Sequence, residues 1–164
     1  MKITASAERH VDAPAGRVYG YIRDFRVHHP RFLPSHFSDF TVESGGVGAG
    51  TVHSFKMTLG GRTTQYRVRV GEPYPGRVLI ESDRTRRMLT TFTVDPDPQG
   101  GSIVRIETCW YTDGLQGLVE RIVAPKLLRG VYEAELNLLD RYARDQVPDA
   151  RRGIDAGKGL ISLV

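Results

Sequence analysis

The sequence predicts one α+β domain, in which a curved antiparallel sheet packs its inner face against a long C-terminal helix. Three observations predict this architecture. Residues 2–11 alternate between apolar and polar side chains, as a half-buried strand does. Residues 36–111 contain about six further strand-like runs, which are separated by turns rich in Gly and Pro. Residues 126–146 place apolar side chains at the spacing of an amphipathic helix.

The first elements are a strand and two short helical segments. One face of the strand is expected to carry Ile3, Ala5, Ala7, Arg9 and Val11. Pro14 suits the first position of a short helix, which should end near Phe25. The second segment, residues 28–34, holds two prolines, so it is limited to one or two helical turns.

A series of hairpins follows. Strands are expected at residues 36–43, 51–59, 63–70, 77–82, 89–94 and 102–111. Gly60-Gly61 is a strong signal for a two-residue hairpin turn. Because short turns join antiparallel neighbours, these runs should form one curved sheet with a single buried face.

The C-terminal part predicts helix. A capping-box pattern at Asp113 favours a helix from about Gly114, which Pro125 should kink or interrupt. The helix over 126–146 should bury Leu127, Leu128, Val131, Tyr132, Leu138, Leu139 and Tyr142, and should expose Arg129, Glu133, Asn137, Asp140, Arg141 and Arg144. Glu135 falls inside the apolar half, so its carboxylate requires a partner or a wet cavity.

Length and composition fit a single globular domain over residues 1–147, followed by a glycine-rich tail at 148–164. The chain has 164 residues, of which 40% are hydrophobic and 26% charged, enough to build a core. No apolar run approaches the roughly 20 residues of a membrane span, and the N-terminus does not resemble a signal peptide. Cys109 is the only cysteine, which excludes an intrachain disulfide and favours a cytoplasmic location.

The net charge of +4 is distributed widely over the sequence. Its one local cluster is Arg84, Arg86 and Arg87, at the turn of an expected hairpin. This cluster is interpreted either as a solvated turn or as a contact for an anionic partner. No pattern of aromatic and basic residues indicates specific nucleic-acid binding.

Four stretches, together with the order of elements, carry a family resemblance. These are residues 11–14 leading into Val18-Tyr19, residues 48–52, residues 101–110 and residues 133–139. Over about residues 3–146 the chain resembles the SRPBCC superfamily of START lipid-transfer domains, polyketide cyclase/dehydrase-like proteins and birch-pollen-allergen-like proteins. Where family members usually have a tryptophan pair, this chain has His28-His29-Pro30-Arg31-Phe32.

The resemblance implies a helix-grip fold, with a seven-stranded curved antiparallel sheet around the C-terminal helix and two short helices between the first two strands. It also implies a cavity for a small hydrophobic molecule such as a lipid, polyketide or isoprenoid. The alternative is a filled core. The residues expected to bind the ligand are Arg9, His53, Phe55, Tyr66, Phe92, Thr108, Trp110, Leu118, Ile122, Val131, Tyr132, Glu135 and Leu139.

Glu135 is expected to orient a ligand hydroxyl or carbonyl, with Arg9 or His53 as the partner of its charge. The alternatives are a structural ion pair, or a glutamate that reaches the cavity mouth. Together with His53, Glu135 could also act as a general acid/base pair for cyclisation or dehydration. No nucleophile motif is present, and Cys109 should point away from the cavity because it alternates with Thr108 and Trp110.

The sequence thus favours a protein that binds or transports a small hydrophobic ligand without catalysis. The alternatives are a cyclase/dehydratase-type enzyme that uses the same cavity and a protein-interaction module, as a monomer or a homodimer. No cofactor or metal is expected. The adjacent His28 and His29 have no further ligands at metal spacing and fit a turn or pocket rim better. The Gly45–Gly50 loop precedes a strand, whereas a phosphate loop needs a helix N-terminus.

Overall fold

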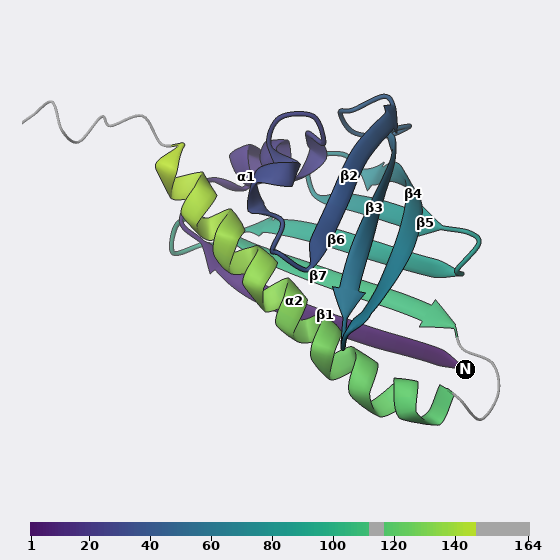
Figure 1. Cartoon of the computed structure of the whole chain (residues 1–164). Coiled ribbons are helices and arrows are strands. Elements are labelled where there is room, and N and C mark those ends of the chain that lie inside the picture. Colours follow the sequence, from purple (N-terminus) through teal and green to yellow (C-terminus); the bar gives the residue numbers. More distant parts are fainter. Residues whose placement is uncertain (112–116, 147–164) are drawn as a thin grey trace, which may run out of the picture.

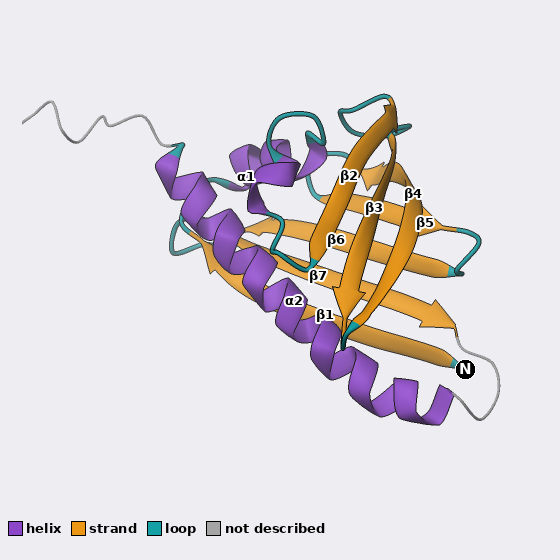
Figure 2. Ribbon diagram, viewed as in Figure 1, coloured by secondary structure: helices purple, strands orange, loops and turns teal. Residues whose placement is uncertain are grey.

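The computed structural model describes residues 1–111 and 117–146, with the side chains of 117–121 excluded. Seven strands and three helical elements follow each other in the predicted order (Figures 1 and 2). They are β1 (Lys2–Val11), α1 (Ala15–Arg23), η1 (His29–Phe32), β2 (Phe37–Ser44), β3 (Val52–Leu59), β4 (Arg62–Tyr74), β5 (Val78–Asp83), β6 (Met88–Pro96), β7 (Ser102–Tyr111) and α2 (Gly117–Asp145).

The strands form one antiparallel sheet in the order β1-β7-β6-β5-β4-β3-β2. From β2 to β7 each strand pairs with its neighbour in sequence, and β1 closes the far edge against β7. The sheet curves around α2, which runs diagonally across its inner face (Figure 1). The predicted helix-grip fold is therefore confirmed.

The inner face of β1 is built so that α2 can pack close to it. Ala5 and Ala7 are buried there, opposite Thr108 and Ile106 of β7. Their small side chains let the helix backbone approach the sheet, and α2 is in close contact with β1 but only marginally with β3. Space between sheet and helix therefore increases from β1 towards β3.

Two strands extend beyond their predicted ends to include a proline: β6 reaches Pro96, and β4 passes Pro73. Glu72-Pro73 was expected to end a strand, but β4 continues to Tyr74, with a register shift between Gly71 and Tyr74. A proline is tolerated at such an irregularity since the hydrogen-bond ladder is already interrupted. The Gly60-Gly61 turn is as predicted, and both glycines have positive φ, at 57° and 78°.

Helix α2 is one element that continues through Pro125, so the interruption allowed for there does not occur. Within the described residues, no helix is long and apolar enough to cross a membrane. The Asp113 capping pattern and the tail at 148–164 lie outside the described residues.

Two assignments on the faces of α2 are wrong. Leu127 was expected to be buried but is 40% exposed, because it lies towards the β3–β4 turn at Gly60 and not in the interior. Asp140 was expected to be exposed, but its side chain is 3% exposed. It accepts hydrogen bonds from Arg9, from Arg144 and from the backbone N–H of Asp12. Arg9 therefore secures β1 to the C-terminal half of α2, and it is not the partner of Glu135.

Candidate functional site

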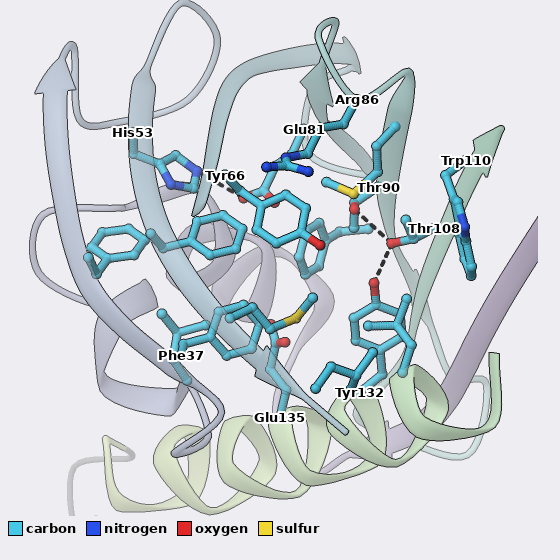
Figure 3. A pocket seen from close by; sticks show the side chains of 18 of the residues that line it. Phe37, His53, Tyr66, Glu81, Arg86, Thr90, Thr108, Trp110, Tyr132 and Glu135 are labelled. Atoms are coloured by element: carbon cyan, nitrogen blue, oxygen red, sulfur yellow. Dashed lines mark hydrogen bonds and ion pairs between the residues drawn. The ribbon is translucent and has the colours of Figure 1, made fainter. Parts of the chain in front are cut away.

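A cavity of about 550 Å³ lies between the inner face of the sheet and α2 (Figure 3). Its wall is mostly aromatic and aliphatic, with a few polar groups. The lining residues are His29, Leu33, Phe37, Phe40, His53, Phe55, Met57, Leu59, Tyr66, Glu81, Thr85, Arg86, Met88, Thr90, Phe92, Thr108, Trp110, Tyr111, Ala124, Leu128, Tyr132 and Glu135. The structure therefore has a cavity at this position and not the filled core that was the alternative.

Most of the residues expected to bind a ligand lie on this wall. They are His53, Phe55, Tyr66, Phe92, Thr108, Trp110, Tyr132 and Glu135. Four others do not line it. Arg9 pairs with Asp140, the side chain of Ile122 is exposed, and Val131 and Leu139 are buried elsewhere in the interior. The side chain of Leu118 lies outside the described residues.

One side of the cavity is a series of stacked rings. The ring centroids of His53 and Phe55 are 5.8 Å apart, and those of Phe55 and Tyr66 are 5.3 Å apart. Phe37 and Phe40 extend the series from β2, with centroids 5.3 Å from Phe55 and 4.9 Å from His53. Such a wall favours flat, conjugated molecules, which it can contact by stacked and edge-to-face geometry.

The two β2 phenylalanines could not be assigned from the sequence. Residues three apart on a regular strand point to opposite faces. Here Asp39 has a φ of 52°, and the register with β3 shifts between Ser38 and Thr41. This bulge turns Phe37 and Phe40 to the same side.

Glu135 and His29 form a polar pair at the α2 side of the cavity. Glu135 Oε1 lies 4.0 Å from His29 Nε2, and both side chains are 3% exposed. Neither Arg9 nor His53, the predicted partners, contacts Glu135. Among the described residues, no group donates or accepts a hydrogen bond with its carboxyl.

The protonation of this pair follows from burial. Burial and the nearby charge of Glu81 raise the pKa of Glu135 to about 8. Burial also lowers the pKa of His29. His29 Nδ1 donates to the carbonyl oxygen of Ile22 at 2.7 Å. A neutral His29 therefore presents an unprotonated Nε2 to a protonated Glu135 at neutral pH.

A second buried pair, His53 and Glu81, lies on the opposite strands. His53 Nε2 donates to Glu81 Oε1 at 3.1 Å. Burial acts to raise the pKa of Glu81, but the hydrogen bond from His53 and the positive charge of His53 outweigh burial, so the pKa of Glu81 is lowered. The ring of Phe25 stacks between His29 and His53, with both centroid distances at 4.7 Å. Because the pKa of Glu81 is lowered and that of Glu135 is raised, Glu81 is the charged carboxylate at neutral pH and Glu135 is the neutral one.

A third polar group is a chain of hydroxyls. Thr90 Oγ1 and Thr108 Oγ1 are 2.7 Å apart, and Thr108 is also hydrogen-bonded to the Tyr132 hydroxyl (Figure 3). Tyr132 and Glu135 lie three residues apart on α2, so both face the cavity. The wall thus has two oxygen-bearing polar sites about one helical turn apart.

Arg86 was expected at a solvated or anion-contacting turn, and the structure places it on the cavity wall as well. The other histidine of the adjacent pair, His28, is not on the wall; its Nδ1 lies 2.6 Å from the Tyr142 hydroxyl. Within residues 1–111 and 117–146, no group of three or more His, Cys, Asp or Glu residues could hold a metal ion.

Comparisons with known proteins agree with this architecture. Over residues 2–144 the chain matches the model of the family described as polyketide cyclase/dehydrase and lipid transport. The KanY protein is 28% identical, with a TM-score of 0.77 over 88% of this chain and 99% of that chain. A protein from Thermus thermophilus is 19% identical, with a TM-score of 0.73 over 88% of this chain and 99% of that chain.

The Zhui aromatase/cyclase from Streptomyces sp. R1128 has the same fold. It is 15% identical, with a TM-score of 0.70 over 92% of this chain and 98% of that chain. A comparison with curated proteins gives no match. Because the family model spans nearly all of the described residues, the chain belongs to the polyketide cyclase/dehydrase and lipid transport family, within the SRPBCC superfamily.

Proposed function

We propose that the protein binds a flat, hydrophobic, oxygen-bearing small molecule in the cavity between the sheet and α2. The cavity volume of about 550 Å³ suits a molecule of two to four fused or linked rings. The ring series ending at Tyr66 supplies contact area for its faces. The polyketide branch of the family description fits this aromatic wall better than a long flexible acyl chain does.

The observation that supports this most is Glu135. A buried carboxyl that lacks a hydrogen bond costs stability, and its polar neighbour His29, at 4.0 Å, is too far for a direct bond. A single ligand oxygen lying about 2.8 Å from both Glu135 Oε1 and His29 Nε2 would hydrogen-bond to each of them. A phenol, enol or aliphatic hydroxyl suits this position, because it can accept from Glu135 and donate to His29.

Ligand displacement tests this anchor. N-phenyl-1-naphthylamine, which fluoresces in apolar surroundings, serves as the cavity reporter, and 2-naphthol and 2-methylnaphthalene compete with it. We expect Glu135→Ala to raise the Kd of 2-naphthol about tenfold and to leave that of 2-methylnaphthalene within about twofold. Glu133→Ala, on the exposed side of the same helix, is the matched control and should change neither.

Two results would contradict the proposal. The first is that the reporter fails to bind, or binds equally well to Met57→Trp, in which a bulky side chain fills the cavity. The second is that 2-naphthol binds wild type and Glu135→Ala with the same Kd. Native mass spectrometry of the freshly purified protein provides an independent measurement, because a retained small molecule would appear as an added mass.

The same pair supports a second candidate function, a dehydratase or cyclase. His29 Nε2 can remove the α-proton of a β-hydroxy ketone while the Glu135 carboxyl protonates the leaving hydroxyl. Water departs, a carbon–carbon double bond forms, and the proton on His29 returns to the Glu135 carboxylate. This assignment replaces the predicted Glu135–His53 pair, since His53 donates to Glu81 instead.

The substrate 3-hydroxy-1-tetralone separates the two functions, because loss of water converts it to fluorescent 1-naphthol. An enzyme should accelerate this conversion, and both Glu135→Ala and His29→Phe should abolish the acceleration. If the protein binds 3-hydroxy-1-tetralone but forms 1-naphthol no faster than buffer does, the dehydratase function is excluded and a binding or transport function is retained.

A further inference from the structure

Arg86 is the lining residue that brings a full positive charge to the described cavity wall. It lies in the turn between β5 and β6, together with Thr85 of the same wall. The side chain of Arg86 is 44% exposed and Tyr111, which also lines the cavity, is 45% exposed, so this part of the wall reaches the protein surface and is called the mouth below. Figure 3 shows the Arg86 guanidinium lying beside Tyr66 on the cavity wall.

Contacts hold the guanidinium in this position. Its Nε donates to the carbonyl oxygen of Gln65 at 3.0 Å, and its central carbon lies 4.9 Å from the centroid of the Tyr66 ring. These contacts use one edge and one face of the guanidinium. The two terminal nitrogens make no hydrogen bond with the described residues. They therefore remain as a pair of donors with a fixed orientation.

The nearby acids leave the terminal nitrogens of Arg86 without a hydrogen bond. Asp83 accepts from the backbone N–H groups of Arg86 and Arg67, and its carboxylate forms an ion pair with Arg86 Nε at 3.8 Å. Glu81 is hydrogen-bonded to His53. The guanidinium is thus held by a carbonyl, an aromatic ring and the ion pair of its Nε with Asp83, while its two terminal nitrogens remain available as hydrogen-bond donors.

We infer that the ligand carries a carboxylate, which Arg86 binds at the mouth while the ligand oxygen reaches Glu135 and His29 at depth. A planar carboxylate matches the two parallel donors of a guanidinium, which can bind it through two hydrogen bonds. The inference rests on the proposed function, and it narrows the ligand to a flat aromatic or conjugated carboxylic acid. It also assigns Arg86 as the residue that selects the acid over its neutral analogue.

Two probes of one shape test this, 2-anthracenecarboxylic acid and 2-anthracenecarboxamide. At pH 7 the first carries a negative charge and the second is neutral. We expect wild type to bind the acid about tenfold more tightly than the amide. In Arg86→Gln the Kd of the acid should rise about tenfold, and that of the amide should stay within about twofold. Arg86→Lys, which keeps the charge without the fork, should recover part of the preference.

Arg84→Gln is the matched control, because Arg84 lies in the same turn but not on the wall of this cavity. It removes the same net charge and should leave both Kd values unchanged. Equal affinity of wild type for acid and amide, or parallel changes of both in Arg86→Gln, would overturn the inference and leave the proposed function in place. Failure of both probes to bind wild type would remove the proposed function and the inference with it.

Discussion

Replacing Glu135 with Gln should make the unliganded protein more stable at neutral pH. Glutamine has nearly the same shape but cannot ionise. The folded protein holds the pKa of Glu135 at about 8, against an ordinary value of 4.5. Between these two pH values the folded state keeps a proton that the unfolded state has released. The free energy of unfolding of wild type therefore falls as the pH rises through this range.

The size of the effect follows from the pKa difference, at about 1.4 kcal/mol for each pH unit. Neutral pH lies about 2.5 pH units above the ordinary pKa of 4.5, so the cost at pH 7 is about 3 kcal/mol. Above pH 8 the cost levels off near 5 kcal/mol, and below pH 4.5 it disappears. Glu135→Gln removes this dependence on pH. The free energy of unfolding of the variant should therefore exceed that of wild type by an amount that grows from pH 4.5 to pH 8.

Urea unfolding at pH 4, 5.5, 7 and 9, followed by circular dichroism, measures the difference directly. Glu133→Gln is the control, since the Glu133 side chain is 54% exposed on the same helix and pairs with Arg129. Its pH dependence should follow that of wild type. Parallel stability curves for wild type and Glu135→Gln would refute the reasoning, because they would mean that Glu135 has the same proton affinity folded and unfolded.

Three further predictions concern regions outside the cavity. The guanidinium of Arg23 holds the pKa of Glu72 at about 2, so its stabilisation is complete above the ordinary value of 4.5 and is lost as the pH falls towards 2. Glu72→Gln should therefore lower stability at pH 7, and acid titration by circular dichroism should show a shallower loss between pH 4.5 and 2 than in wild type. Gly101 has a φ of 80°, and an added Cβ would lie 2.5 Å from the carbonyl oxygen of Val11, so Gly101→Ala should destabilise by more than about 1 kcal/mol in urea unfolding. Gly16→Ala, in α1 with open space around it, should instead stabilise by up to about 1 kcal/mol.

Much of the fold could be predicted from the sequence, because local signals and tertiary structure agree there. The alternation in residues 2–11 gives the bounds of β1 as observed, and its small inner residues explain why α2 lies against it. The prediction was wrong where a local signal was overridden. Glu72-Pro73 has the composition of a turn. The Glu72 carboxylate, however, accepts hydrogen bonds from Tyr19 and Arg23, and these bonds keep the segment in β4.

The site was predicted less completely, since its partners are joined only by the fold. The helical period identified Glu135 as a carboxyl inside an apolar face. No periodicity could show that Arg9 would meet Asp140, or that His29 would reach Glu135 from a short helix. Arg86 lies in a turn whose composition indicates solvent exposure. Only the path of its long side chain back over Tyr66 places it on the cavity wall.

Glu135 and Arg86 together favour a ligand over a purely structural role for the cavity. A domain of this size is stabilised by about 5–15 kcal/mol in total, so a carboxyl that costs about 3 kcal/mol at pH 7 is a large burden on the fold. Asp140 and Glu72, by contrast, are buried acids whose contacts with arginines stabilise the structure. Glu135 has only His29 nearby, at 4.0 Å and without a hydrogen bond, and the terminal nitrogens of Arg86 make no hydrogen bond with the described residues. Two polar groups with unused hydrogen-bonding capacity on one cavity wall are explained if their hydrogen-bond partners arrive together, on a single molecule that has a hydroxyl at one end and an acid at the other.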